Sequence, residues 1–418
     1  MKFQKGSIRR SLYYSILDGL FTAMMLGVSE FYFIPYGLAL GASAAQTGML
    51  ATAPMLVAAL LSVRSASLTQ SLGSRMQLIR PVVLLHALSW VPILAIPFVL
   101  KGDRAPWAPW ALLAAAAVFA STGAFAVPAW QSLMSDYIPM RRRGAYFGWR
   151  NRLQGLMTVL VSVTAGLVLN AFGKGSLTGF TIIFAFAMMC RFYAWVCLSR
   201  MIEPFRRSSH DEYFSFVDFL RQLRTSHVAR FVVFAAMITF SANFSGALLP
   251  AFLLKDLGFS YATFMMLVTS ASLSGFVFQW YWGGSADVEG NVRAIKRAAW
   301  CIAVTPLLWM VSRDPAYLFF VQLFAGCVWG GFTMLTINFT LEAATPERKI
   351  RSLAYMNVTT SFSAFAGAVL GGLLLHHLPP LFGYSYLTLF LLSCFLRIAV
   401  MVFVAPKVRD VRPAARAL

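Results

Sequence analysis

Twelve apolar stretches, each long enough to cross a membrane as a helix, run through most of the 418-residue chain. Such a helix needs about 20 mainly apolar residues to cross roughly 30 Å of hydrocarbon. The sequence therefore predicts an all-α membrane protein with twelve transmembrane helices. The predicted spans lie near residues 12–40, 47–69, 81–100, 107–136, 154–172, 177–201, 231–254, 262–284, 298–312, 316–342, 358–376 and 386–405.

The composition agrees with a membrane protein and argues against a soluble one. Only 12% of the residues are charged and 59% are hydrophobic, whereas soluble domains carry about 25% charged residues. The formal net charge of +20 suggests nucleic-acid binding, but the apolar stretches leave almost no soluble surface to present a basic patch. We therefore expect no nucleic-acid partner.

The sequence motifs indicate neither a metal site nor an enzyme. The five cysteines all lie inside apolar stretches, without a CxxC pair or clustered histidines, so they are expected to be small core residues. No Walker-type phosphate loop, catalytic triad or HExxH pattern occurs. We expect no catalytic residue, no metal and no cofactor, with a proton gradient as the energy source.

The distribution of basic residues predicts the orientation of the chain in the membrane. Two of the 35 lysines and arginines lie deep in spans, and 28 lie at the termini, in even-numbered loops or at their borders. Only five lie in odd-numbered turns, namely Lys101, Arg104, Lys174, Lys255 and Arg313. By the positive-inside rule both termini are cytoplasmic, and we expect a multi-pass protein of a bacterial inner membrane whose basic residues face anionic lipid.

A polar segment at 203–230 divides the chain into halves with six predicted spans each. Its charged residues alternate with aromatic and aliphatic ones at roughly helical spacing, which indicates a short amphipathic helix on the membrane surface. We expect an N-terminal six-helix bundle at 1–202 and a cytoplasmic linker at 203–230. A C-terminal six-helix bundle with a basic cytoplasmic tail follows at 231–418.

The two halves are related by an internal repeat. A shift of 206 residues superimposes several unusual residues, and transporter folds are commonly built from such repeats. The superimposed pairs are Asp136 and Glu342, Arg143 and Lys349, Asn151 and Asn357, Gly166 and Gly372, and Arg191 and Arg397. An arginine deep in a late span of each half favours a parallel duplication.

One polar segment between spans 8 and 9 carries a family resemblance. It resembles the GxxxDxxG signature, followed by basic residues, of the major facilitator superfamily, and it lies on the side predicted to be cytoplasmic. The matching residues are Gly283, Asp287, Gly290 and Arg293. The counterpart at 66–75 keeps Gly73 and Arg75 but lacks the first glycine and the aspartate. The resemblance implies two pseudo-symmetric six-helix bundles, the major facilitator fold.

Charged residues at the predicted cytoplasmic helix ends are candidates for a gate. The segment 135–151 resembles the family's turn between spans 4 and 5, and 342–357 echoes it. Ion pairs there either form and break during gating or make a permanent charge lattice at the lipid surface. The gate candidates are Asp136, Arg143, Gly283, Asp287, Gly290, Arg293 and Glu342.

Two carboxylates in the first predicted span are candidates for proton coupling. Asp18 and Glu30 lie about 18 Å apart along a helix, and an ionised group inside a membrane costs at least a few kcal/mol. Either residue could take a proton whose binding is coupled to conformation. Alternatively, Asp18 pairs with a cytoplasmic arginine, and Glu30 is satisfied by hydroxyl groups or a deep arginine. We favour Glu30 as the coupling residue.

The buried arginines and several polar or aromatic residues are candidates for solute contact. Arg191 and Arg397 could bind an anionic substrate, but their duplication favours a structural role in which each holds its helix by pairing with a carboxylate or backbone carbonyls. The resemblance implies that spans 1, 4, 7 and 10 line the path, although each residue there could merely pack. The path candidates are Tyr32, Tyr36, Trp130, Gln131, Asn243, Trp329 and Asn338.

These features together predict a secondary active transporter of a small organic solute. The aromatic, methionine-rich spans suit a hydrophobic or amphipathic molecule moved by alternating access and coupled to protons. The alternatives are an uncoupled facilitator or lipid flippase and, from another class, a non-transporting membrane scaffold or sensor. We expect a monomer whose partners are its solute and membrane lipid.

Overall fold

The computed structural model describes residues 5–138, 140–173, 175–203, 227–343 and 349–408. Twelve helical segments among them are long and apolar enough to cross a membrane, and these ranges contain no β-strand. The prediction of an all-α protein with twelve transmembrane helices is confirmed. The predicted linker helix falls almost entirely on residues 204–226, outside the described ranges, so it stays a prediction.

Contacts within the chain divide it into two compact units, named here the N-terminal unit and the C-terminal unit. The N-terminal unit consists of Met1–Gln46, Ala53–Ser209 and Ser260–Met265, and the C-terminal unit of Thr47–Thr52, His210–Phe259 and Met266–Leu418.

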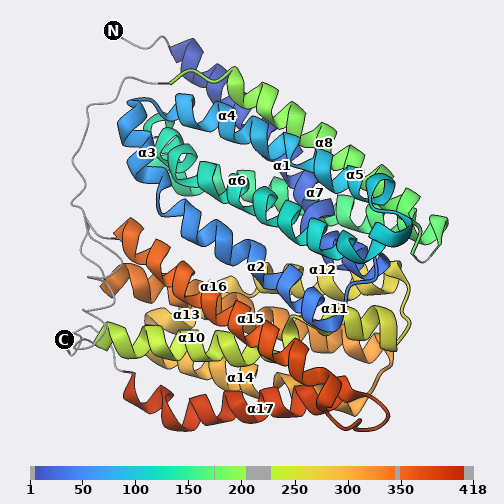
Figure 1. The fold of residues 1–418 in the computed structure, drawn as a ribbon. Coiled ribbons are helices and arrows are strands. Elements are labelled where there is room, and N and C mark those ends of the chain that lie inside the picture. Colours follow the sequence, from blue (N-terminus) through green and yellow to red (C-terminus); the bar gives the residue numbers. More distant parts are fainter. Residues whose placement is uncertain (1–4, 139, 174, 204–226, 344–348, 409–418) are drawn as a thin grey trace, which may run out of the picture. The chain divides into compact units, whose positions relative to one another are not determined.

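The helices that belong wholly or mainly to the N-terminal unit are labelled in Figure 1. They are α1 (Lys5–Ala39), α2 (Ala44–Ser62), α3 (Ser65–Leu72), α4 (Arg75–Leu88), α5 (Trp90–Val99), α6 (Ala108–Tyr137), α7 (Met140–Phe172) and α8 (Leu177–Ser199). A short turn of 3-10 helix at Gly102–Trp107 precedes α6.

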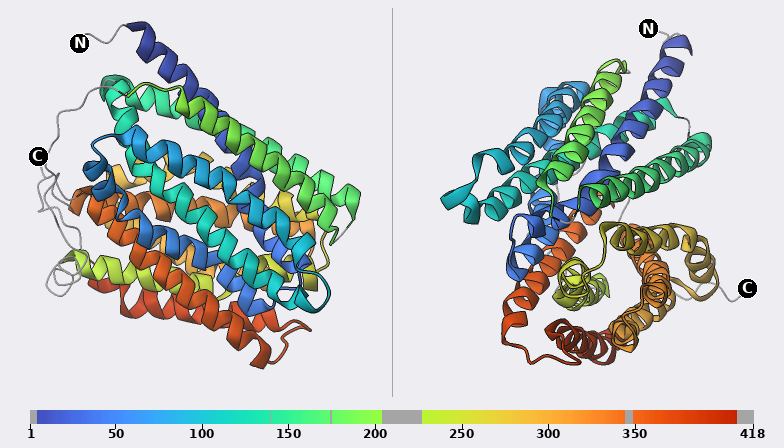
Figure 2. Two further views of the ribbon diagram at one scale, coloured as in Figure 1. Left: turned by 45° about the horizontal axis from the view of Figure 1, so that its top comes forward. Right: turned by 90° about the vertical axis from the view of Figure 1, so that its right-hand side faces the viewer.

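Several helices of the C-terminal unit are seen nearly end-on in the right-hand view of Figure 2. They are α10 (His227–Gly246), α11 (Leu249–Ala251) with a π-helical turn at Phe252–Asp256, α12 (Tyr261–Val277), α13 (Gln279–Glu289), α14 (Asn291–Val311), α15 (Pro315–Ala343), α16 (Lys349–Leu374) and α17 (Ser385–Phe403). Short 3-10 turns follow α16 and α17 at Leu375–His377 and Ala405–Lys407.

The helices pack in the same pairs in both units. In the N-terminal unit α1 packs on α7 and α8, and α4 packs on α6 and α8. In the C-terminal unit α10 packs on α16 and α17, and α14 packs on α15 and α17. Since α10, α14, α15, α16 and α17 occupy the repeat positions of α1, α4, α6, α7 and α8, the packing confirms two pseudo-symmetric bundles.

Several helix ends differ from the predicted spans. The chain turns at 63–64, so the predicted span 47–69 is two helices, α2 and α3. Helix α7 begins at Met140 rather than near 154 because its basic first turns are helical outside the apolar window. The signature segment 283–293 is also largely helical. Gly290 breaks it between α13 and α14 with φ 90°, a backbone conformation that favours glycine.

Glycines bring α16 directly against α10 in the C-terminal unit. A Cβ atom at Gly367 or Gly371 would overlap the backbone carbonyl oxygen of Phe240 or Phe244, respectively. Such small residues, spaced four apart, let helix backbones approach closely in membranes. No side chain larger than hydrogen fits at these two positions without moving the helices apart.

We therefore predict that Gly371→Ala destabilises the protein. The added methyl group forces α16 away from α10, which is expected to cost about 1–3 kcal/mol and to lower the apparent Tm in a mild detergent. Gly155→Ala on α7 is the matched control, because a Cβ atom there meets nothing within 4 Å. Equal Tm values for the two variants would contradict this account of the packing.

Candidate functional site

Asp18 lies between two arginines inside the N-terminal unit. Its residue surface is 4% exposed, and its Oδ2 lies 3.5 Å from Nη2 of Arg150 on α7. Arg191 on α8 is close enough to interact electrostatically with Asp18, and its Nη1 donates a hydrogen bond of 2.8 Å to Oγ1 of Thr22. Asp18 therefore has the arginine partners that the structural interpretation of this residue requires.

Arg150 connects α1 to α7 through several contacts. Its Nε donates to the carbonyl oxygen of Ser15 at 3.2 Å, and its Nη1 donates to Oε1 of Gln154 at 2.9 Å. A Cβ atom at Gly19 would lie 2.7 Å from the guanidinium, so the glycine makes room for this approach. Sequence reasoning counted Arg150 only among the basic residues near a cytoplasmic turn.

Arg150 also contacts one of the predicted path residues. Its guanidinium carbon lies 4.5 Å from the ring centroid of Trp130, within the range of a cation–π interaction. Gln131, the next residue, is exposed. Trp130 thus belongs to the charged group around Asp18 rather than standing alone on α6.

The other proton-coupling candidate lies on the same helix. Glu30 is within α1, but its side chain is outside the described part of the chain, as is that of Arg143 on α7. The roles predicted for Glu30 and Arg143 stay predictions.

The two predicted path tyrosines of α1 are core residues in this conformation. Tyr32 is 0% and Tyr36 is 1% exposed. The Tyr32 hydroxyl donates to the carbonyl oxygen of Ser162 at 2.6 Å, and the Tyr36 hydroxyl donates to that of Ile93 at 3.3 Å. Tyr36 also packs against Phe184. Both tyrosines are packed and hydrogen-bonded here, and their contact with a solute stays a prediction.

The path candidates of the C-terminal unit differ in their surroundings. Asn243 is half-buried and donates to the carbonyl oxygen of Thr239, one turn earlier on α10, at 3.0 Å. Asn338 is half-buried on α15. Trp329, on the same helix, lines a cavity.

A second group of charges joins three segments of the N-terminal unit around Arg75, which is 2% exposed. Its Nη1 lies 2.6 Å from Oδ2 of Asp136 at the end of α6, and its Nε lies 3.0 Å from Oε1 of Glu203, after α8. Sequence reasoning identified Asp136 but missed both partners. The sequence offered one sign of this ion group, namely Arg75, the basic residue that the 66–75 segment keeps.

Glu203 also caps the first turn of α4. It accepts hydrogen bonds from Ser74 Oγ at 2.5 Å and from the backbone N–H groups of Arg75 and Met76 at 2.9 Å and 3.2 Å. A carboxylate is favoured at a helix N-terminus. Partial burial acts to raise the pKa of Glu203, but these hydrogen bonds and the Arg75 guanidinium outweigh it and lower the pKa below its usual value.

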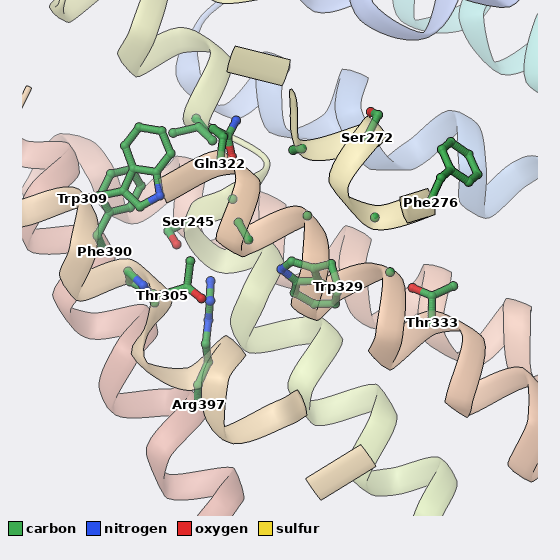
Figure 3. Close-up of a pocket in the computed structure, with 18 of the residues that line it drawn as sticks. Ser245, Ser272, Phe276, Thr305, Trp309, Gln322, Trp329, Thr333, Phe390 and Arg397 are labelled. Atoms are coloured by element: carbon green, nitrogen blue, oxygen red, sulfur yellow. The ribbon is translucent and has the colours of Figure 1, made fainter. Parts of the chain in front are cut away.

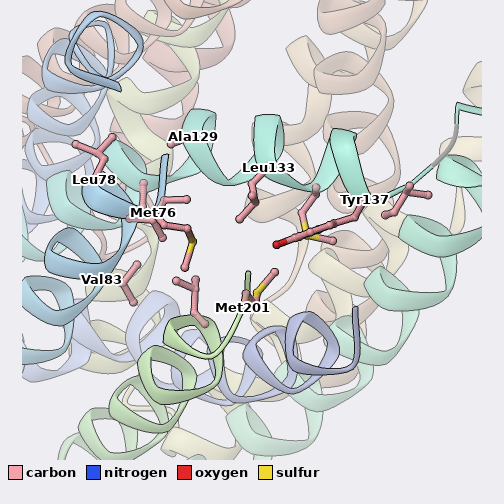
Figure 4. Close-up of a cluster of buried hydrophobic side chains, with 12 residues drawn as sticks. Met76, Leu78, Val83, Ala129, Leu133, Tyr137 and Met201 are labelled. Carbon is pink, nitrogen blue, oxygen red and sulfur yellow. The ribbon is translucent and has the colours of Figure 1, made fainter. Parts of the chain in front are cut away.

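A buried apolar cluster shares α4, α6 and the end of α8 with this ion group. Figure 4 shows side chains of α4, α6 and the end of α8 meeting there. The cluster consists of Met76, Leu78, Ile79, Val83, Ala126, Ala129, Leu133, Met134, Tyr137, Ile138, Leu198 and Met201. The Tyr137 hydroxyl also donates a short hydrogen bond to the carbonyl oxygen of Ile202. Arg75 itself is 2% exposed, and low exposure to solvent strengthens an ion pair.

The C-terminal signature segment uses a different ion pair. Arg297 on α14 lies 2.7 Å from Oε1 of Glu289 at the end of α13, and its guanidinium stacks over Trp282. Two of the predicted gate residues, Asp287 and Arg293, are exposed. The gate candidate Glu342 is exposed near the end of α15. The two halves thus hold their corresponding helix ends with different residues.

A cavity of about 520 Å³ lies within the C-terminal unit (Figure 3). Pockets for small organic ligands typically measure about 300–1,000 Å³ and are mostly apolar with a few polar groups. Residues of α10 to α15 and α17 line the cavity, namely Ser245, Gly246, Leu249, Ala271, Ser272, Gly275, Phe276, Gln279, Thr305, Pro306, Trp309, Gln322, Ala325, Gly326, Trp329, Gly330, Thr333, Phe390 and Arg397.

Arg397 is the charged residue of this lining and is held by neutral groups. Its Nε donates to Ser393 Oγ at 3.2 Å, its Nη1 to the carbonyl oxygen of Ile302 at 2.8 Å, and its Nη2 to that of Ala242 at 3.2 Å. Arg397 therefore connects α17 with α14 and α10. This is one of the two structural pairings expected from the sequence, the one through backbone carbonyls.

The Arg75 group leads to a prediction about stability and pH. Glu203→Gln is expected to lower the apparent Tm at pH 7 by the equivalent of about 1–3 kcal/mol, the value of hydrogen bonds to a charged group. Because the folded-state pKa of Glu203 is lowered, its stabilisation is present above the unfolded pKa of about 4.3. It is lost as the pH falls through the folded pKa.

The measurement is the Tm of wild type and variant in detergent between pH 3 and pH 7. Asp103→Asn, which removes an exposed carboxylate, is the matched control and should leave the Tm unchanged at pH 7. A difference between wild type and Glu203→Gln that stays constant across this range would contradict the assigned role.

Solved structures of known proteins share this fold. The chain is similar to the nucleoside transporter NupG, with a TM-score of 0.70 and 11% identity over 95% of this chain and 98% of that one. It is similar to a D-xylose-proton symporter (TM-score 0.69, 11% identity, 97% of this chain and 98% of that one). It is also similar to a bacterial homologue of the iron transporter ferroportin in its inward-facing state, with a TM-score of 0.66 and 15% identity over 94% of this chain and 98% of that one.

At such identities the structural likeness shows the fold alone, and no curated protein matches the sequence. A sequence model of the Major Facilitator Superfamily, however, matches residues 19–297 and 231–418. These matches cover most of the chain. The chain therefore belongs to the Major Facilitator Superfamily and is a multi-pass membrane protein with a transporter fold.

Proposed function

We propose that the chain is a secondary transporter that moves a small organic, hydrophobic or amphipathic solute by alternating access. Membership of the superfamily supports the transporter class. The observation that carries the choice of solute is the cavity of the C-terminal unit. Its lining is mostly apolar and aromatic, with a few hydroxyl and amide groups, one arginine and no carboxylate. Such a lining suits a molecule that is largely apolar with one polar end.

Proton coupling through α1 is the second part of this proposal. Asp18 is a buried carboxylate beside Arg150 and Arg191. Its protonation would leave two arginines without their counterion, so a protonated Asp18 would favour a conformation in which these arginines move apart. Glu30, on the same helix, is the preferred proton acceptor from its place within the first span.

An uncoupled facilitator is the second candidate function. The observation that favours it is the ion pair of Asp18 with Arg150, because a permanent pair would hold α1 against α7 and need not exchange a proton. The two candidates differ in whether a pH gradient drives solute movement.

We also propose that both termini are cytoplasmic and that the membrane is a bacterial inner membrane. The support is the concentration of lysine and arginine at the termini and in even-numbered loops. Transport as a monomer is the simplest arrangement for a chain that contains both repeats.

Flux measurements in proteoliposomes test the coupled function. A thermal-shift screen over metabolites and toxic amphiphiles first identifies a stabilising solute, and its movement is then followed under an imposed pH gradient. We predict that Glu30→Gln lowers gradient-driven flux at least about tenfold, because removal of the proton acceptor removes the differential protonation of the two conformations. Asp18→Asn is expected to lower it as well.

Ser29→Ala is the matched control, since it changes a buried neutral side chain next to Glu30 on α1. Unchanged pH dependence in both Glu30→Gln and Asp18→Asn would contradict proton coupling and support the facilitator. Absence of flux for every stabilising solute, together with a stable co-purifying protein, would overturn the transporter and indicate a scaffold or sensor.

A further inference from the structure

Arg397 carries a buried charge for which the described residues supply no counterion. Its residue surface is 5% exposed, and no described carboxylate lies within ion-pair distance of its guanidinium. A guanidinium has five N–H donors and keeps its charge in proteins. Three donors are used by neutral acceptors, which leaves one N–H on each terminal nitrogen.

The repeat partner of Arg397 is in a different electrostatic environment. Arg191 occupies the same place in the N-terminal half, and Asp18 lies near enough to interact with its charge. The lining of the C-terminal cavity contains Arg397 but no aspartate or glutamate. An uncompensated charge in a membrane interior is costly, so Arg397 is suited to an anion that arrives from outside the protein.

Two further donors in the same cavity have no hydrogen-bond partner among the described residues. Trp309 is 5% exposed and Gln322 is 6% exposed, both line the cavity, and no hydrogen bond of the Trp309 indole N–H or the Gln322 carboxamide is found among the described residues. The fully enclosed unpaired side-chain atoms of the described residues do not include these two groups, so both remain accessible to a ligand that enters the cavity. Figure 3 shows Trp309, Gln322 and Arg397 around one space, with Arg397 extending past Thr305. Unpaired donors and a cation together favour a negatively charged acceptor.

We propose that this cavity binds an aromatic monocarboxylate and that such an acid is the solute of the transporter. Arg397 binds the carboxylate together with the indole N–H of Trp309 and the carboxamide of Gln322. The aromatic body lies against Trp329, since rings favour offset or edge-on contact with other rings. The assignment of a transported solute rests on the proposed function, whereas binding itself does not.

Binding to the purified full-length protein in a neutral detergent tests this site. The probe is 2-naphthoate at pH 7.5, compared with 2-naphthamide, which has the same ring system and no charge. We expect 2-naphthoate to raise the apparent Tm in a dose-dependent manner and to bind at least about tenfold more tightly than the amide by calorimetry, the ratio expected from hydrogen bonds to a charged group. Equal affinity of acid and amide would overturn the proposal.

Substitutions locate the site. Trp309→Phe keeps a ring and removes the indole N–H, and Gln322→Met keeps much of the side-chain length and removes the carboxamide. Each is expected to weaken 2-naphthoate binding about fivefold or more, whereas Trp300→Phe, at an exposed position of α14, serves as the control. Arg397→Lys should weaken binding furthest. Because Arg397 also connects three helices, its substitution can disturb the fold. The location of the site is therefore decided by Trp309→Phe and Gln322→Met, and both variants must elute as monodisperse protein.

The outcomes separate this inference from the transporter proposal. Binding of 2-naphthoate that Trp309→Phe and Gln322→Met weaken, without flux of any solute in proteoliposomes, would support the site and overturn transport. Flux of other solutes without charge-selective binding of 2-naphthoate would overturn the site alone. Binding that neither variant changes would also overturn it. Displacement of 2-naphthoate by a phosphate-bearing lipid, but by no free acid, would overturn the soluble acid as the ligand. It would indicate that the cavity binds a lipid headgroup.

Discussion

The cost of placing a charge inside hydrocarbon is the constraint on which this structure depends. An ionised side chain in a membrane span needs a counterion, several hydrogen bonds or a bound ligand. The N-terminal unit meets this demand from within, by placing Asp18 near Arg150 and Arg191. The C-terminal unit meets it for Arg397 with two backbone carbonyls and one hydroxyl group. The two repeats therefore share a fold and differ in how they satisfy a buried arginine.

The fold was predictable because hydrophobic length and repeat symmetry are properties of the sequence itself. The apolar stretches predicted twelve spans, and the corresponding positions of Arg191 and Arg397 indicated the duplication. Helix ends were less predictable, because they depend on turns and caps rather than on hydrophobicity. The start of α7 at Met140 is an example, since a basic segment outside the apolar window is nevertheless helical.

The candidate site was only partly predictable, because its contacts join residues far apart in the sequence. Asp136 and Asp18 were identified from their unusual positions, but their partners Arg75 and Arg150 were grouped with the ordinary basic residues of the loops. The duplication argument favoured the same structural role for Arg191 and Arg397. No sequence pattern shows that one arginine has a nearby acid while the other lines a cavity without one.

We propose that the chain carries an organic acid across a membrane by exposing one site alternately to each side. The decisive measurement is entrance counterflow at pH 7.5, since this exchange needs no knowledge of the coupling ion. Proteoliposomes are loaded with unlabelled 2-naphthoate and diluted into a trace of labelled 2-naphthoate. We expect a transient accumulation of label that protein-free liposomes and Trp309→Phe protein lack. Equilibration of label at the rate of protein-free liposomes, with no overshoot, would contradict it.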